Sequence, residues 1–260
     1  MAALLEARGL EKTFGSVVAA ANIQVAVNEH EVVGIIGANG AGKTTFVNMV
    51  TGYVKPSAGQ ILYEGREITR LTPRAVTRIG ISRSFQIPQV FLTASAIDNL
   101  LISLGVAERR LLQVWRPLRR PELLEQAQQI LARYSIAGYA QQQAVLLPQG
   151  VRKLLDIAMA VVHHPRVLLL DEPTSGVAVE EKFGIMDTVM AALKEQRVTV
   201  LFVEHDMEII QRYASRVLAF YDGAIIADGP PESVLEDQQV RRFVIGEKLH
   251  RFAAGEGGHA

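Results

Sequence analysis

In the first 85 residues, apolar and polar side chains alternate over short stretches that turn residues separate. Positions 4–8 and 23–27 follow this alternation, which predicts strands because successive strand residues point to opposite faces. A turn is predicted at 56–59, and a hairpin is predicted to follow it over 60–66. These features predict an antiparallel β subdomain at the N-terminus.

The pattern changes after residue 87, where apolar residues begin to recur at intervals of three and four. Such spacing places side chains on one face of a helix. The residues that share a face are Ile97, Leu100, Leu101 and Leu104 in one group and Leu123, Ala127, Ile130, Leu131 and Tyr134 in the other. The sequence therefore predicts a helical insertion over 87–147.

Short, fully apolar runs then alternate with helical patterns. Helices are predicted over 151–163, over 180–196 and from residue 232, and strands over 167–170, 198–203, 217–221 and 224–228. Apolar strands that alternate with helices are typical of a parallel sheet with both faces covered. The second half of the chain therefore predicts an α/β fold.

The composition narrows the class of protein. The 260 residues include 27 basic and 27 acidic side chains, so a nucleic-acid-binding protein with a broad basic surface is disfavoured. Because the chain contains no Cys, it has neither disulfides nor cysteine metal sites. We find no signal peptide and no window of about 18 residues that is free of charged or strongly polar side chains, and so expect a cytoplasmic protein that does not cross a membrane.

Residues 37–44 read Gly-Ala-Asn-Gly-Ala-Gly-Lys-Thr, which matches the phosphate-loop motif G-x-x-x-x-G-K-[ST]. A predicted strand at 32–36 precedes the loop and a predicted helix follows it, as this motif requires. The glycines let successive N–H groups point at one anion, at the positive end of the helix dipole. Lys43 would add a cation for the β- and γ-phosphates, and Thr44 a hydroxyl for Mg²⁺. The residues predicted to contact the nucleotide are Gly37, Ala38, Asn39, Gly40, Ala41, Gly42, Lys43, Thr44 and Thr45.

Polar residues follow two of the later apolar strands. Asp171 and Glu172 come directly after the strand at 167–170, and His205 follows the next strand. Phosphoryl transfer to water needs an acid that orients the metal and a group that positions the attacking water. We assign the metal to Asp171 together with Thr44, and the catalytic role to Glu172. His205 is a second catalytic candidate, because it can donate to a γ-phosphate oxygen.

Together these residues resemble the nucleotide-binding subunit of an ATP-binding cassette (ABC) transporter, over almost the whole chain. The resemblance implies ATP and Mg²⁺ as cofactors, with Gln86 as a further Mg²⁺ ligand that couples the helical insertion to the nucleotide. It also implies that Phe14 stacks on adenine, for which any aromatic face serves. Leu147 and Gly150 match the family's signature motif, which covers ATP held by a partner. A second ABC ATPase subunit is thus implied, in a head-to-tail homodimer or heterodimer.

Two segments depart from the usual pattern of the family. The signature is commonly Leu-Ser-Gly-Gly-Gln, and here Pro148, Gln149 and Val151 replace the Ser, the first Gly and the Gln. A hydroxyl that would donate to the γ-phosphate is therefore missing. Ala178 stands where the family usually has Asp, or Asn in one importer branch. The departures place in question the communication across the dimer and the rate of hydrolysis.

Segments 81–86, 229–234 and 240–246 are similar to the branch of importers that carries branched-chain amino acids, where Pro is common in the signature. The resemblance implies an ATPase at the inner face of the cell membrane, with permease subunits and, indirectly, a solute-binding protein as partners. Amide or urea importers share the pattern and remain an alternative. A weakly hydrolysing regulatory protein and a non-transport ABC protein are further alternatives, the latter because of a basic segment at 109–120.

The predicted fold class is an α/β P-loop NTPase (RecA-like) core with a mainly parallel sheet, an N-terminal antiparallel β subdomain and an inserted α-helical subdomain. We expect one ABC ATPase domain over 1–260. Within it, we expect a nucleotide-binding core at 1–86 and 148–245, a helical insertion at 87–147 and a C-terminal tail at 246–260.

Overall fold

A six-stranded sheet forms the centre of the computed structural model, which describes residues 3–107 and 117–246. Its strand order is β10-β9-β3-β8-β7-β6, and every pair is parallel except β9 with β10. The strands are β3 (Val32–Gly37), β6 (Ile81–Ser84), β7 (Val167–Asp171), β8 (Thr199–Val203), β9 (Arg216–Tyr221) and β10 (Ala224–Gly229). This arrangement confirms the predicted, mainly parallel sheet.

A second sheet of four strands, in the order β2-β1-β4-β5, is antiparallel throughout. Its strands are β1 (Leu5–Phe14), β2 (Val17–Val27), β4 (Ala58–Tyr63) and β5 (Arg66–Glu67). The predicted antiparallel subdomain is confirmed. The turn expected at 56–59 ends earlier, because the pairing of Ala58 with Glu11 already starts β4.

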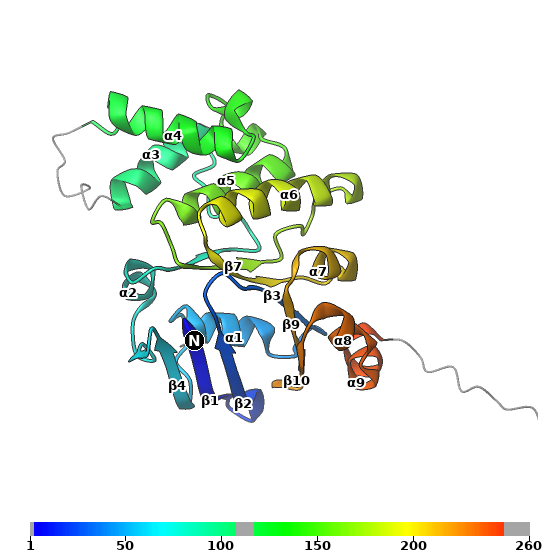
Figure 1. The fold of residues 1–260 in the computed structure, drawn as a ribbon. Coiled ribbons are helices and arrows are strands. Elements are labelled where there is room, and N and C mark those ends of the chain that lie inside the picture. Colours follow the sequence, from blue (N-terminus) through cyan, green and yellow to red (C-terminus); the bar gives the residue numbers. More distant parts are fainter. Residues whose placement is uncertain (1–2, 108–116, 247–260) are drawn as a thin grey trace, which may run out of the picture.

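Helices flank the two sheets (Figure 1). They are α1 (Lys43–Val50), α2 (Pro73–Arg78), α3 (Ala96–Ala107), α4 (Pro121–Arg133), α5 (Gln149–Val161), α6 (Val179–Glu195), α7 (Met207–Tyr213), α8 (Pro231–Glu236) and α9 (Gln238–Val240). Short helical turns lie at η2 (Ala137–Tyr139), η3 (Ala144–Leu146) and η4 (Arg241–Ile245). Helix α2 was not predicted from the sequence, although Thr72 caps it and Pro73 occupies its first turn.

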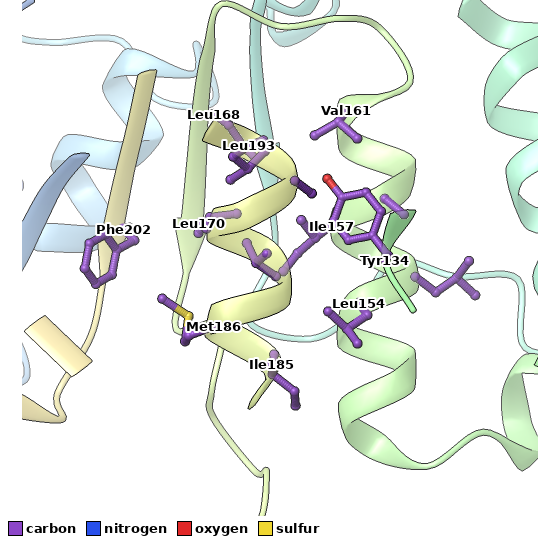
Figure 2. Close-up of a cluster of buried hydrophobic side chains, with 14 of the residues drawn as sticks. Tyr134, Leu154, Ile157, Val161, Leu168, Leu170, Ile185, Met186, Leu193 and Phe202 are labelled. Carbon is purple, nitrogen blue, oxygen red and sulfur yellow. The ribbon is translucent and has the colours of Figure 1, made fainter. Parts of the chain in front are cut away.

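The two faces of the six-stranded sheet belong to separate hydrophobic clusters. On β7, Leu168 and Leu170 point into a cluster with α3, α4, α5 and α6, part of which Figure 2 shows. Val167 and Leu169 point into the other cluster, which contains α1 and the four-stranded sheet. Since side chains of a strand alternate, one apolar strand serves both cores. The helix after the phosphate loop is thereby fixed against both sheets.

The helical insertion packs as the sequence predicted. Ile130 is partly buried and the other residues of the two predicted apolar groups are buried. In Figure 1, α3 and α4 lie beyond α5, on the far side from the four-stranded sheet. The boundaries of the insertion stay a prediction. Much of the basic segment, 108–116, and most of the expected tail, 247–260, lie outside the described residues. In the described part of the basic segment, Arg119 forms an ion pair with Asp98 at 2.8 Å.

Within the residues described, no helix has the length and apolar character needed to cross a membrane.

Candidate active site

The phosphate loop connects the end of β3 to the start of α1, and close contacts explain its glycines. Gly40 (φ +82°) and Gly42 (φ +100°) adopt left-handed backbone conformations, which residues with a Cβ rarely take. A Cβ on Gly42 would lie 2.6 Å from the carbonyl oxygen of Ala19, and one on Gly37 would lie 2.6 Å from that of Phe220. The loop is therefore held against β2 and β9 in a shape that only glycine permits.

Lys43 lies across this loop. Its Nζ donates to the carbonyl oxygens of Gly37 at 2.7 Å and Ala38 at 3.0 Å, and the residue is only 6% exposed. Burial lowers the pKa of the Lys43 ammonium, while the negative charges of Glu172 and Asp171 act in the opposite direction. The loop cation and both acids predicted from sequence therefore share one electrostatic environment.

The other predicted residues follow neighbouring strands of the same sheet. Because β3, β6, β7 and β8 are parallel, their carboxyl ends meet at one edge, where ligands bind in open α/β sheets. The phosphate loop follows β3, Gln86 follows β6, Glu172 follows β7 and His205 follows β8. The topology brings together residues that are far apart in sequence.

Glu172 is the centre of this group. Gln86 Nε2 donates to Glu172 Oε2 at 2.7 Å, and His205 Nε2 lies 3.1 Å from Glu172 Oε1. The backbone of Glu172 has a φ of +48°, an uncommon conformation for a non-glycine residue, and its N–H donates to the carbonyl oxygen of Val203 at 3.0 Å. Both carboxylate oxygens are thus oriented by side chains from adjacent strand ends.

Asp171, the last residue of β7, is buried and forms an ion pair. Its Oδ2 accepts a hydrogen bond from Arg83 Nη2 at 2.5 Å. No role was predicted for Arg83, although a charged residue within a short, otherwise uncharged strand indicates a buried partner.

Two further buried charges were missed. Lys153 of α5 is 2% exposed, and its Nζ donates to the carbonyl oxygens of Gln86 at 2.5 Å and Glu172 at 3.1 Å. Burial lowers the pKa of Lys153. Glu204 Oε1 accepts from the N–H of Thr174 at 2.9 Å and from its hydroxyl at 2.7 Å. Glu204 Oε2 accepts from the N–H of His205 at 3.2 Å, so this carboxylate joins the loops after β7 and β8.

The oxygen-bearing groups at this edge fit Mg²⁺, which prefers oxygen ligands. In the described part of the chain, no group of three or more His, Asp or Glu side chains is arranged to hold a metal ion by itself. Asp171, the hydroxyl of exposed Thr44 and the amide of Gln86 would therefore supply only part of a coordination sphere. This agrees with the usual behaviour of Mg²⁺, which takes its other ligands from substrate phosphates and water.

Phe14 ends β1 and is 49% exposed, with Lys12 Nζ at 4.9 Å from its ring centroid. An exposed aromatic face can stack on a base as well as contact a cation. Adenine stacking by Phe14 stays a prediction.

The sequence pattern of the family described as "ABC transporter" matches residues 20–175, more than half of the chain. The chain belongs to this family. It is 33% identical over 255 residues to the high-affinity branched-chain amino acid transport ATP-binding protein BraF of Pseudomonas aeruginosa, covering 94% of this chain and 98% of that one. It is 32% identical to the probable branched-chain amino acid transport ATP-binding protein LivG of Archaeoglobus fulgidus, covering 97% of this chain and 99% of the relative.

Among solved structures, the ADP conformation of MJ1267, an ATP-binding cassette of an ABC transporter, is similar. Its TM-score is 0.82 at 30% identity, over 95% of this chain and 100% of that one. These comparisons confirm the predicted family, the P-loop NTPase fold and the prediction that the chain is an ATPase.

The ABC signature segment lies at the start of α5, where packing within the chain accounts for two of its residues. Leu147 is 3% exposed and belongs to the hydrophobic core. A Cβ on Gly150 would lie 2.6 Å from Ile185 Cδ1 of α6, so this glycine permits close contact between the two helices. The side chain of Gln149 lies against Gly176, in the loop before α6. That Leu147 and Gly150 contact a nucleotide stays a prediction.

Proposed function

We propose that this chain is the MgATP-hydrolysing subunit of an import system for branched-chain amino acids. The observation that carries the catalytic part is the orientation of Glu172 by Gln86 and His205, with Lys43 in the same electrostatic environment. Amino-acid import is inferred from relatives of nearly equal length whose names state this function.

In the proposed mechanism, the N–H groups at the start of α1 and the ammonium of Lys43 bind the phosphates. Thr44, Gln86 and Asp171 would hold Mg²⁺, which would supply positive charge to the phosphate oxygens. Glu172 accepts a proton from the water that attacks the γ-phosphorus, while the bond from that phosphorus to the β–γ bridging oxygen breaks and ADP leaves. His205, which lies beside Glu172, orients that water and donates to the γ-phosphate.

The proposed partners are a second ABC ATPase subunit, permease subunits and, indirectly, a solute-binding protein, at the inner face of the cell membrane. The start of α5 would cover the nucleotide of the second subunit. A cavity of about 240 Å³ next to the Gln86 loop, lined in part by Phe85, Gln89 and Asp156, offers the permease a place of contact. The domain boundaries given from sequence form part of this proposal.

ATP binding and turnover by purified protein test the catalytic part. We expect Lys43→Ala to weaken ATP binding by at least about tenfold, because charge-assisted hydrogen bonds contribute about 1.5–3 kcal/mol each. Lys194→Ala, which changes an exposed lysine on α6, is the matched control. Unimpaired binding and turnover by Lys43→Ala would remove the phosphate loop from the site.

Solute uptake tests the transport part. Cells that lack the gene should lose uptake of radiolabelled leucine, and the wild-type gene should restore it while the Glu172→Gln variant should not. Loss of acetamide or urea uptake alone would favour an amide or urea importer. Unchanged uptake of all three solutes would favour a non-transport ABC protein.

A weakly hydrolysing regulatory protein is the second candidate, and two helix starts favour it. Pro148 and Ala178 occupy the N-cap positions of α5 and α6, and neither side chain makes a capping hydrogen bond. Neither residue offers a hydroxyl or carboxylate across the proposed dimer. ATPase activity no higher than that of Glu172→Gln, measured with the permease present, would support this candidate.

A further inference from the structure

Arg83 is a buried cation at the edge of the sheet where the candidate site lies. It belongs to β6, whose other residues, at 81, 82 and 84, are buried, and its own side chain is only 7% exposed. A buried guanidinium is costly unless charged or polar partners surround it. Its contacts therefore indicate why the strand contains a charge.

The guanidinium connects two parts of the proposed nucleotide site. Nη2 donates to Asp171 Oδ2 at 2.5 Å, and Nη1 donates to Asn48 Oδ1 at 2.6 Å. Asn48 lies on α1, the helix that begins at the phosphate loop, whereas Asp171 ends β7. Arg83 thus ties the acid proposed for the metal to the helix that follows the phosphate loop.

Two aromatic rings hold the guanidinium in place. Its central carbon lies 4.8 Å from the ring centroid of Phe85 and 6.0 Å from that of Tyr53. The two rings contact each other edge to face, with their centroids 5.8 Å apart. A planar fork that donates in two directions while facing aromatic rings is a geometry that Lys cannot reproduce.

We propose that Arg83 is a positioning residue for Asp171, an inference that rests on the proposed MgATP site. By engaging Oδ2, Arg83 fixes the orientation of the carboxylate and leaves Oδ1 for the metal. Through Asn48, it also sets the position of Asp171 relative to α1. Groups that orient a metal-binding carboxylate commonly change metal affinity by about 10- to 100-fold when they are removed.

A purely structural ion pair would behave differently. Its loss would reduce the stability of the fold or weaken nucleotide binding to the same extent with and without metal. Positioning of Asp171, in contrast, affects only the part of nucleotide binding that depends on the metal. The ratio of affinities with and without metal therefore separates the two roles.

The test measures binding of β,γ-imido-ATP, a non-hydrolysable ATP analogue, by calorimetry in EDTA and in Mg²⁺. We define the Mg²⁺ gain as the ratio of the affinity in Mg²⁺ to the affinity in EDTA. In Arg83→Met, we expect metal-free affinity within about twofold of wild type and a fall of at least about tenfold in the Mg²⁺ gain. Arg83→Lys should restore little of this gain. A gain equal to or larger than that of wild type in Arg83→Met overturns the proposal.

Two variants keep the test decisive. Asn48→Ala leaves the Arg83–Asp171 pair and removes only the hydrogen bond between Arg83 and Asn48. The Mg²⁺ gain should therefore also fall in this variant, but by less than in Arg83→Met. This variant keeps the test possible even if Arg83→Met does not fold. An unchanged gain in folded Asn48→Ala also counts against the proposal. Arg216→Met is the matched control, because it removes a partly buried ion pair with Asp228 at the opposite edge of the sheet.

The outcome also separates this inference from the proposed function. Wild-type protein that does not bind the analogue with or without Mg²⁺ would contradict the MgATP site itself. If wild type binds with a clear Mg²⁺ gain and Arg83→Met shows the same gain, only the role of Arg83 is wrong.

Discussion

Glu172 Oε1 and His205 Nε2 lie 3.1 Å apart, at the carboxyl ends of adjacent parallel strands. Because Gln86 engages the other carboxylate oxygen, both oxygens of Glu172 are oriented by neighbouring side chains. In the proposed role of general base, Glu172 would need little reorganisation to accept a proton.

Glu172→Gln should therefore separate binding from hydrolysis. The amide keeps the shape of the side chain but cannot accept the proton, so kcat should fall by about 100- to 10,000-fold. ATP affinity, measured by calorimetry, should stay within about threefold of wild type, because the phosphates are bound by other groups. Glu180→Gln, an exposed change in the first turn of α6, is the control and should leave kcat unchanged. Hydrolysis at the wild-type rate by Glu172→Gln would remove Glu172 from the role of base.

Glu204→Gln should show that the backbone of His205 needs its buried acceptor. Glu204 accepts from Thr174 through one oxygen and from the N–H of His205 through the other. In Gln, an NH₂ group replaces one of the two oxygens and faces a group that also donates. A buried donor left without an acceptor costs about 1–3 kcal/mol. We expect the free energy of unfolding to fall by about that amount and kcat to fall more than ATP affinity. Urea unfolding and steady-state kinetics measure the two effects.

Equal losses of kcat and ATP affinity in Glu204→Gln would mean that Glu204 supports the fold and has no particular effect on His205. Glu208→Gln, an exposed change in the first turn of α7, serves as its control.

The sequence predicted the parts of the site that local motifs encode. The phosphate loop and Asp171 with Glu172 each follow a strand that its apolar residues reveal, so the chemistry and the fold were predicted together. Lys153 and Glu204 were missed because their roles depend on tertiary contacts. Lys153 reaches the carbonyl oxygen of Gln86, 67 positions away, and the partner is a backbone atom that residue types cannot indicate.

The helix boundaries show the same limit. The short helix α2 has no long apolar period, and only its cap at Thr72 and Pro73 marks it. Longer elements with a regular period, such as α5 and α6, were predicted within a few residues.

Asp156 should make the stability of the protein depend on pH. Burial raises the pKa of this carboxyl to about 6, although the N–H groups of Gln89 and Phe85 donate to it at 2.8 and 3.3 Å. With its folded-state pKa above the unfolded value, Asp156 favours the folded state at low pH. This contribution is lost as pH rises through about 6.

The measurement is urea unfolding of wild type and Asp156→Asn at several pH values. The free energy of unfolding of wild type minus that of the variant should fall by about 2 kcal/mol between about pH 4.5 and about pH 7.5. Other carboxyl groups cancel in this difference. A difference that stays constant, or that rises with pH, contradicts the assignment.

Gly150→Ala should test whether packing between α5 and α6 requires this glycine of the signature segment. The added Cβ would lie 2.6 Å from Ile185 Cδ1, and overpacking of this kind destabilises a core by about 1–3 kcal/mol. Ile185→Val removes that same Cδ1 atom and by itself costs about 0.5–1.5 kcal/mol. In the double variant, the loss of unfolding free energy should therefore be smaller than the sum of the two single losses by about 1 kcal/mol or more. Gly184→Ala, on α6 with no atom near its added Cβ, is the control and should raise stability by about 0.5–1 kcal/mol. Strictly additive effects of Gly150→Ala and Ile185→Val would show that the glycine is not required by Ile185, and would leave a role at the nucleotide of the partner subunit as the reason for it.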